Sequence, residues 1–299
     1  MDYSYYPSPS RRMAVFGSRG MVATSQQLAA QAGLEILKDG GNAVDAAVAT
    51  AAALTVVEPC MNGIGGDAFA ILWMDGKMFG LNSTGPAPAL LSAGALREKG
   101  FDSMPEFGLC PVTVPGAPAA WSELCSRFGR MTLRQALRPA IEYASEGFAV
   151  SPVVAALWKE AAEKTYAPYK TDPQFAGWYP TFTKEGRAPR AGEKMTLLDH
   201  AKTLFEIASS DAESFYRGPL AERIDAFSRE AGGFLRKEDL AGFEPEWVSP
   251  LRVGYRGHDV WELPPNGQGM IALIGLGILD GLSVPAKDDP ERWHLLIEA

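Results

Sequence analysis

The alternation of hydrophobic and polar residues predicts two consecutive helices near the start of the chain. Ser25 is a candidate N-cap for a helix that runs through Leu37, where glycines at 40–41 supply the positive φ that ends it. Asn42 is the candidate cap of a second helix, Ala43–Val57, which is rich in alanine and apolar on all sides. A helix of that kind buries every face, so we expect it to be a core element.

Two strand pairs are also predicted. Residues 69–82 flank an Asp-Gly pair at 75–76 that favours a type I′ turn, and the apolar run before this turn predicts a first strand buried on both faces. Residues 251–263 form a second pair around Arg-Gly at 256–257. An apolar helix is expected to follow from Met270 to about Leu279.

Helices are predicted to dominate residues 117–165. Thr132 with Gln135 has the spacing of a capping box, and Ser151 followed by Pro152 opens a further helix. Helical patterns therefore account for the middle third of the chain.

Residues 166–189 have no periodicity and predict a long ordered loop, after which Thr196 with Asp199 predicts another capped helix. No flexible Gly/Ser linker separates two halves of the chain. We therefore expect a loose N-terminal tail over 1–18 and one intertwined domain over 19–299.

Composition excludes several classes of protein. The hydrophobic content of 46% is enough for a sizeable core, and the net charge of −8 argues against a nucleic-acid partner. The nearly uncharged stretch 46–57 is too short to span a membrane, and residues 1–12 lack the pattern of a secretory signal, so we expect a cytoplasmic protein. Cys60, Cys110 and Cys125 are odd in number and widely spaced, which indicates neither a disulfide framework nor a zinc site.

A search for a complete catalytic motif finds none. The three histidines, His200, His258 and His294, are far apart, so we predict no metal site, and nothing indicates a cofactor. Neither a G-x-S-x-G nor an S-x-x-K motif is present, although a serine triad assembled from distant residues stays open. The glycine string at 63–67 lacks the Lys-Ser/Thr of a phosphate loop and indicates a tight turn with close backbone approach.

Several strings, taken together and in order, resemble the gamma-glutamyltransferase (gamma-glutamyltranspeptidase) family over about residues 19 to 299. They are Gly20-Met-Val-Ala-Thr-Ser25, Gly40-Gly-Asn-Ala-Val-Asp-Ala-Ala47, Glu58-Pro59, Asn62-Gly-Ile-Gly-Gly-Asp67, Val112-Thr-Val-Pro-Gly-Ala117, Phe215-Tyr-Arg-Gly218 and Pro264-Pro-Asn-Gly-Gln-Gly269. The resemblance implies an α/β fold: the large-subunit part, with many helices, of a four-layer αββα sandwich of the N-terminal-nucleophile hydrolases.

The resemblance also implies a mechanism. Family members are precursors that cut themselves before a Thr in a Thr-Thr-His-like segment, and the new N-terminal amine then serves as base for that threonine's hydroxyl. No threonine here has a histidine two residues later. The resemblance therefore places the nucleophile beyond Ala299 and implies no catalytic residue in this chain, which we expect to be inactive alone and to need the small subunit of the same precursor. The segment 291–299 has no C-cap residue, from which we expect a chain truncated within a helix.

One departure from the family pattern concerns the substrate. Where the family has Asp-x-Arg-Glu-x-Ala-Pro, this chain has Asn82-Ser-Thr-Gly-Pro-Ala-Pro88, so Thr84 stands at the position of the arginine that holds a substrate carboxylate. We predict Asn82, Ser83 and Thr84 as substrate-binding residues. A strand end and turn explains the same residues without a substrate.

Three functions therefore remain open. The first is transfer or hydrolysis of gamma-glutamyl groups on small amides, and the second is an oxamate-like amidohydrolase or acylase of the same family. The third, of another class, is a non-catalytic pseudoenzyme or a subunit that acts only with a separate partner.

Overall fold

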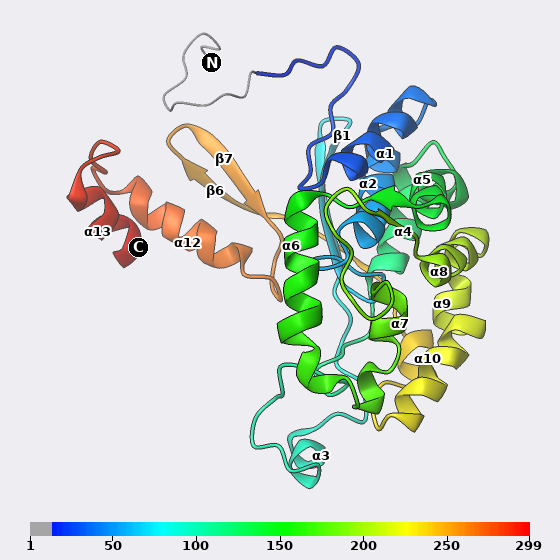
Figure 1. The fold of residues 1–299 in the computed structure, drawn as a ribbon. Helices are drawn as coiled ribbons and strands as arrows, with labels where there is room; N and C mark the ends of the chain where they lie inside the picture. The colour runs from blue at the N-terminus through cyan, green and yellow to red at the C-terminus, as the bar shows by residue number, and fades with distance from the viewer. Residues whose placement is uncertain (1–13) are drawn as a thin grey trace. The chain divides into compact units, whose positions relative to one another are not determined.

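The computed structural model describes residues 14–299, so most of the tail predicted over 1–18 lies outside the described residues. The chain divides into two compact units, each built from two stretches of sequence. The first, which we call the helical unit, contains the described residues up to Ile64 together with Trp121–Phe215. The second, the sheet unit, contains Gly65–Ala120 together with Tyr216–Ala299 (Figure 1). The expectation of one intertwined domain stays a prediction.

The centre of the helical unit is α2 (Ala43–Val57), which packs against α1 (Gln27–Lys38) and α5 (Leu133–Glu146), while α5 also packs against α8 (Leu198–Ser209) (Figure 1). Eleven of the fifteen residues of α2 are buried, which confirms the predicted core helix. Small alanines on α2 let the helices approach closely, and burial of one large apolar side chain such as Ile36 contributes about 1.5–3 kcal/mol.

The prediction that Asn42 caps α2 is confirmed, and the prediction that Ser25 caps α1 is wrong. The side-chain oxygen of Asn42 accepts from the N–H groups of Val44 and Asp45, and the Asp45 carboxylate accepts from the backbone N–H of Asn42. At α1 the N-cap is Gln26. Ser25 Oγ instead donates to Glu58 Oε2 at 2.6 Å, because a hydroxyl prefers a carboxylate acceptor when one lies within reach.

The Thr132–Gln135 capping box of α5 is also confirmed. The predicted cap at Thr196 is wrong, because α8 begins after Leu197 with no side-chain cap. The Leu197 N–H donates to Ala144 O at 2.8 Å, which ties this turn to α5, and Asp199 pairs with Lys202. Tertiary contacts therefore start this helix without the capping box.

The segment predicted as a long loop is ordered, but short helical turns make up much of it. α6 (Pro152–Glu160) runs into η1 (Ala161–Thr165), and η2 (Ala167–Tyr169), η3 (Pro173–Phe175) and α7 (Trp178–Phe182) follow. Their aromatic rings pack against one another, and Trp158 Nε1 on α6 donates to Phe182 O at 2.6 Å. After this segment, β4 (Lys194–Met195) pairs with β3 (Phe148–Ala149).

The sheet unit contains an antiparallel sheet of order β1-β2-β5, formed by β1 (Ala68–Met74), β2 (Lys77–Ser83) and β5 (Glu246–Val248). The predicted hairpin is confirmed, with positive φ at both Asp75 and Gly76. The prediction that β1 is buried on both faces is wrong. β1 is an edge strand, and every second side chain along it (Phe69, Ile71, Trp73) is 41–65% exposed, because the described residues cover only one of its faces.

The second predicted strand pair is confirmed as β6 (Leu251–Tyr255) and β7 (His258–Glu262), and the apolar helix that follows is α12 (Gly269–Asp280), packed on both strands (Figure 1). The remaining helices are α3 (Ala93–Glu98), α4 (Ala117–Phe128), α9 (Glu213–Arg217), α10 (Pro219–Glu230), α11 (Lys237–Ala241) and α13 (Pro290–Glu298). None of the helices over residues 14–299 has the length and apolarity to cross a membrane.

Candidate functional site

The three predicted substrate-binding residues lie where β2 leaves the sheet. Ser83 is fully buried, and its Oγ donates to Gly116 O at 2.7 Å. A Cβ at Gly116 would stand 1.8 Å from Ser83 O, so only glycine allows this approach. Ser83 therefore supports the backbone here, while Asn82 and Thr84 remain partly accessible.

The chain beyond Thr84 is fixed by further close backbone contacts within the sheet unit. Val114 N–H donates to Pro86 O at 3.0 Å, and a Cβ at Gly85 would overlap Val114 O. Gly66 O accepts from the N–H groups of Gly116 and Ala117 at 2.9 and 3.0 Å. The carbonyl of Gly66, which lies in the glycine string at 63–67, thus anchors the start of α4, and close backbone contacts flank the end of β2.

A third residue, Asn266, joins Asn82 and Thr84 in a polar cluster that we call the amide cluster. Asn82 Oδ1 accepts from the backbone N–H of Thr84 at 3.0 Å, and Asn82 Nδ2 donates to Asn266 Oδ1 at 3.1 Å. Thr84 Oγ1 lies 2.8 Å from Asn82 Oδ1 and 2.9 Å from Asn266 Oδ1. Since the hydroxyl has one proton for these two oxygens, its donor capacity is used inside the cluster.

An apolar cavity of about 490 Å³ lies beside the amide cluster. Phe69, on its wall, is the direct cross-strand partner of Asn82, so these two side chains share one face of the hairpin. Gly267, which follows Asn266 in the chain, also lines the cavity, and a Cβ there would lie 4.0 Å from the Phe69 ring. The remaining lining residues are Ala70, Ile71, Glu262, Leu263, Gln268 and Gly269.

One carboxylate belongs to this cavity. Glu262, the last residue of β7, lies over the first residue of α12, because a Cβ at Gly269 would stand 2.4 Å from Glu262 Oε2. The free N–H groups at a helix N-terminus favour a nearby negative charge. The site therefore has a neutral, donor-rich end and an apolar body with one anionic side chain on its wall.

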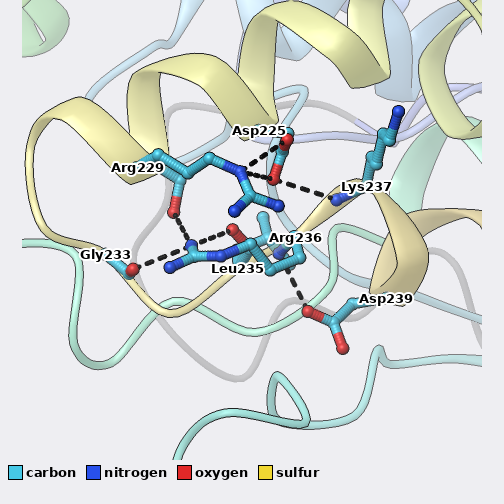
Figure 2. Close-up of polar contacts among 8 residues, drawn as sticks. Asp225, Arg229, Gly233, Leu235, Arg236, Lys237 and Asp239 are labelled. Atoms are coloured by element: carbon cyan, nitrogen blue, oxygen red, sulfur yellow. Dashed lines mark hydrogen bonds and ion pairs between the residues drawn. The ribbon is translucent and has the colours of Figure 1, made fainter.

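The loop that follows the amide cluster is tied to a network of charged residues, drawn in Figure 2. Asp239 Oδ1 accepts from the Ala89 N–H at 2.9 Å. Its Oδ2 accepts from the Arg236 N–H at 2.8 Å (Figure 2). Arg236 Nη1 donates to the carbonyls of Gly233 and Leu235. Asp239 thus bridges this network and the chain just after the cluster.

The same network includes a second aspartate. Asp225 accepts from Arg229 Nε at 2.9 Å and from the Lys237 N–H at 3.3 Å (Figure 2). The hydrogen bond from Arg229 holds the pKa of the Asp225 carboxyl below its usual range. Asp225 therefore acts as an ionised acceptor that links α10 to the start of α11.

Two cysteines and one histidine, Cys60, Cys125 and His200, are not set up as nucleophiles or bases at neutral pH. Burial raises the pKa of the Cys60 thiol to about 11 and that of Cys125 to about 12, which keeps both protonated. Burial lowers the pKa of His200 to about 4, and its Nε2 has no hydrogen-bond partner in the described part of the chain. Over residues 14–299, no three His, Cys, Asp or Glu side chains gather as metal ligands would.

Sequence reasoning did not select Asn266 or the cavity. Asn266 stands in one of the strings that carry the family resemblance, but 184 residues separate it from Asn82, and no pattern in the sequence pairs them. The available signal was that Asn82 ends one predicted strand pair and Asn266 follows the other shortly after its end.

The family model described as gamma-glutamyltranspeptidase matches residues 29–299. The chain belongs to this family. It is 34% identical to the glutathione hydrolase-like YwrD proenzyme of Bacillus subtilis (strain 168), over 96% of this chain and 54% of that protein. The chain thus spans about half the length of the curated relatives it matches.

Solved structures show the same fold. The crystal structure of cephalosporin acylase from Bacillus halodurans is 52% identical, with a TM-score of 0.93 over 98% of this chain and 55% of that chain. The crystal structure of Helicobacter pylori gamma-glutamyltranspeptidase is 30% identical, with a TM-score of 0.85 over 95% of this chain and 82% of that chain. These likenesses confirm the predicted fold class, the large-subunit part of an N-terminal-nucleophile hydrolase sandwich.

Proposed function

We propose that this chain is the large-subunit region of a precursor that cleaves itself before a downstream threonine and then hydrolyses small acyl amides. Within the family, we therefore group this chain with the amidohydrolases and acylases as a proposal. The observation that carries the proposal is the amide cluster, in which Thr84 stands where the family pattern has an arginine and where its neighbours, Asn82 and Asn266, are also uncharged.

The free energies of hydrogen bonds favour a neutral acyl amide over a gamma-glutamyl substrate. A hydrogen bond to a charged group contributes about 1.5–3 kcal/mol and a neutral one about 0.5–1.5 kcal/mol. Replacing a guanidinium by amides and a hydroxyl therefore weakens the preference for a substrate carboxylate by roughly tenfold or more. An acyl group with neutral polar atoms and an apolar body suits the amide cluster and its cavity better than a gamma-glutamyl group does.

The partner in this proposal is the small subunit of the same precursor. The sheet unit leaves large apolar side chains of α12 and α13 exposed, namely Met270, Ile271, Ile274, Ile278, Trp293 and Ile297. Apolar surface on this scale is typical of a protein interface. The downstream part of the precursor is the occupant that the family assignment supports, and it would also bring the threonine and the oxyanion donors.

Mass spectrometry of the full-length protein tests this function. We expect two fragments from the wild type and one uncut chain from a variant with alanine in place of the threonine at the cleavage point. The processed protein should release amine from an acyl anilide, and residues 1–299 alone should not. A single uncut chain in both samples, with no amide hydrolysis, would instead favour a pseudoenzyme or a partner-dependent subunit.

Transfer or hydrolysis of gamma-glutamyl groups is a second candidate, favoured by one observation. The Glu262 carboxylate on the cavity wall offers an anionic partner to a substrate ammonium group. If this function holds, Glu262→Gln will reduce kcat/KM for a gamma-glutamyl anilide and leave a neutral acyl anilide unchanged.

A further inference from the structure

The backbone N–H of Thr84 determines how every group in the amide cluster points. This N–H can only donate, so the atom of the Asn82 amide that faces it must be the oxygen. Asn82 Nδ2 then faces Asn266, and the atom of Asn266 that receives it must again be an oxygen. The orientation of the Asn266 amide therefore follows from a backbone group 182 residues away in sequence.

This orientation leaves Asn266 Nδ2, with two N–H donors, on the side of the amide away from Asn82 and Thr84. Among the described residues this nitrogen has no hydrogen-bond partner, and the Asn266 side chain is exposed. Thr84, by contrast, uses its one hydroxyl proton within the cluster. Asn266 is thus the member of the cluster with the most unused donors.

We propose that Asn266 is a specificity-determining residue that donates its side-chain N–H groups to an oxygen on the substrate's acyl group. This inference rests on the proposed amide hydrolysis and names the residue that reads the acyl group. The substrate class is an acyl amide whose acyl chain carries a hydrogen-bond acceptor near one end and an otherwise apolar body.

The neighbouring cavity supports this assignment. Gly267 links Asn266 directly to the cavity wall, and Phe69 stands beside both Asn82 and Gly267. A cavity of about 490 Å³ is within the usual range of small-molecule sites. An acyl chain lying against Phe69 would bring its polar end to the Asn266 amide, so polar and apolar recognition would come from adjacent residues.

The test compares three p-nitroanilides with acyl chains of similar length, measured on the full-length, processed protein. Hexanoyl has no second acceptor, the methyl ketone oxohexanoyl has a neutral one, and glutaryl has a carboxylate. Asn266→Asp is the main variant, because its carboxylate keeps an oxygen toward Asn82 but has no N–H to offer a substrate. Asn266→Ala is the second variant, and Gln31→Ala, which removes an exposed amide on α1, is the matched control.

In both Asn266 variants we expect kcat/KM for oxohexanoyl relative to hexanoyl to fall by about fivefold to tenfold. Asn266→Asp should reduce glutaryl hydrolysis further through charge repulsion, and Gln31→Ala should change none of the ratios. Self-cleavage and the melting temperature, measured in parallel, show whether each variant folds.

Two results would overturn the inference and are distinguishable. If the wild type hydrolyses these anilides but the oxohexanoyl-to-hexanoyl ratio is unchanged in the folded variants, the assignment of Asn266 fails while the proposed function stands. If the wild type neither cleaves itself nor hydrolyses any of the three substrates, both proposals fail together.

Discussion

Two helices of this chain, α2 in the helical unit and α12 in the sheet unit, are both largely apolar but differ in how far they are buried. α2 buries eleven of its fifteen residues, whereas α12, although nearly free of polar residues, buries only Leu273 and Leu279. A helix that is apolar on all sides requires cover on all sides. The comparison shows that the helical unit covers its apolar helix with its own residues, while the sheet unit does not.

The largest effect is expected from a charge placed inside α2. Ala49 is fully buried, so Ala49→Asp should lower the free energy of unfolding by about 4 kcal/mol or more, since the interior offers the carboxylate no partner. Ala47→Asp, at an exposed position of the same helix, is the control and should change it by less than about 0.5 kcal/mol. Urea denaturation of both variants measures the difference, and equal losses would contradict the assignment of the buried face.

The helical unit should also lose stability in acid through His200. Burial lowers the pKa of His200 in the folded chain to about 4, below the ordinary value of 6.5, so the unfolded chain binds the proton more readily. The stabilising effect is complete above pH 6.5 and is lost as the pH falls toward 4. The total loss is about 3 kcal/mol.

Denaturation of His200→Leu over the same pH range provides the check on this prediction. The variant should show a flatter dependence of unfolding free energy on pH than the wild type, because the titrating group is gone. Identical slopes in the two proteins would show that His200 titrates normally in the folded chain.

A smaller effect is expected in the sheet unit from Asp239, which accepts from the N–H groups of Ala89 and Arg236. Asp239→Asn turns an amide N–H toward one of these two N–H donors and should lower the free energy of unfolding by about 1–2 kcal/mol. The control is Asp289→Asn, because within residues 14–299 the Asp289 carboxylate accepts only from the Glu291 N–H, and asparagine caps a helix equally well. A thermal melt in which both variants match the wild type would argue against a bridging role for Asp239.

The smallest effect on stability, and the sharpest test of the comparison, is expected on α12. Ile274 is 54% exposed, so Ile274→Asp should change the unfolding free energy of residues 1–299 by less than about 0.5 kcal/mol. The same substitution should reduce self-association of residues 1–299, measured by light scattering, because it breaks an apolar surface. A wild-type chain of residues 1–299 that stays monomeric at high concentration would show that α12 needs no cover.

Local signals in the sequence predicted much of the fold. The caps at Asn42 and Thr132 and the Asp-Gly turn succeeded because each depends on neighbours within a few residues. The caps at Ser25 and Thr196 failed because tertiary contacts decided those helix starts.

The candidate site was less predictable than the fold. Comparison of Thr84 with the family pattern drew attention to the end of β2, but Asn266 reaches that point only through the three-dimensional fold. The exposure of β1 was missed for a related reason. An apolar run indicates that a strand will be covered, but it does not identify which residues provide the cover.

The most direct test of the central claim, that the proposed acyl-binding site is neutral, is to restore the family's guanidinium with Thr84→Arg. The measurement is kcat/KM for a gamma-glutamyl anilide relative to hexanoyl anilide in the full-length, processed protein, with Thr84→Ser as control. We predict that Thr84→Arg raises this ratio by about tenfold to a hundredfold and that Thr84→Ser does not. A wild type that already strongly prefers the gamma-glutamyl substrate, with no gain in Thr84→Arg, would contradict the account.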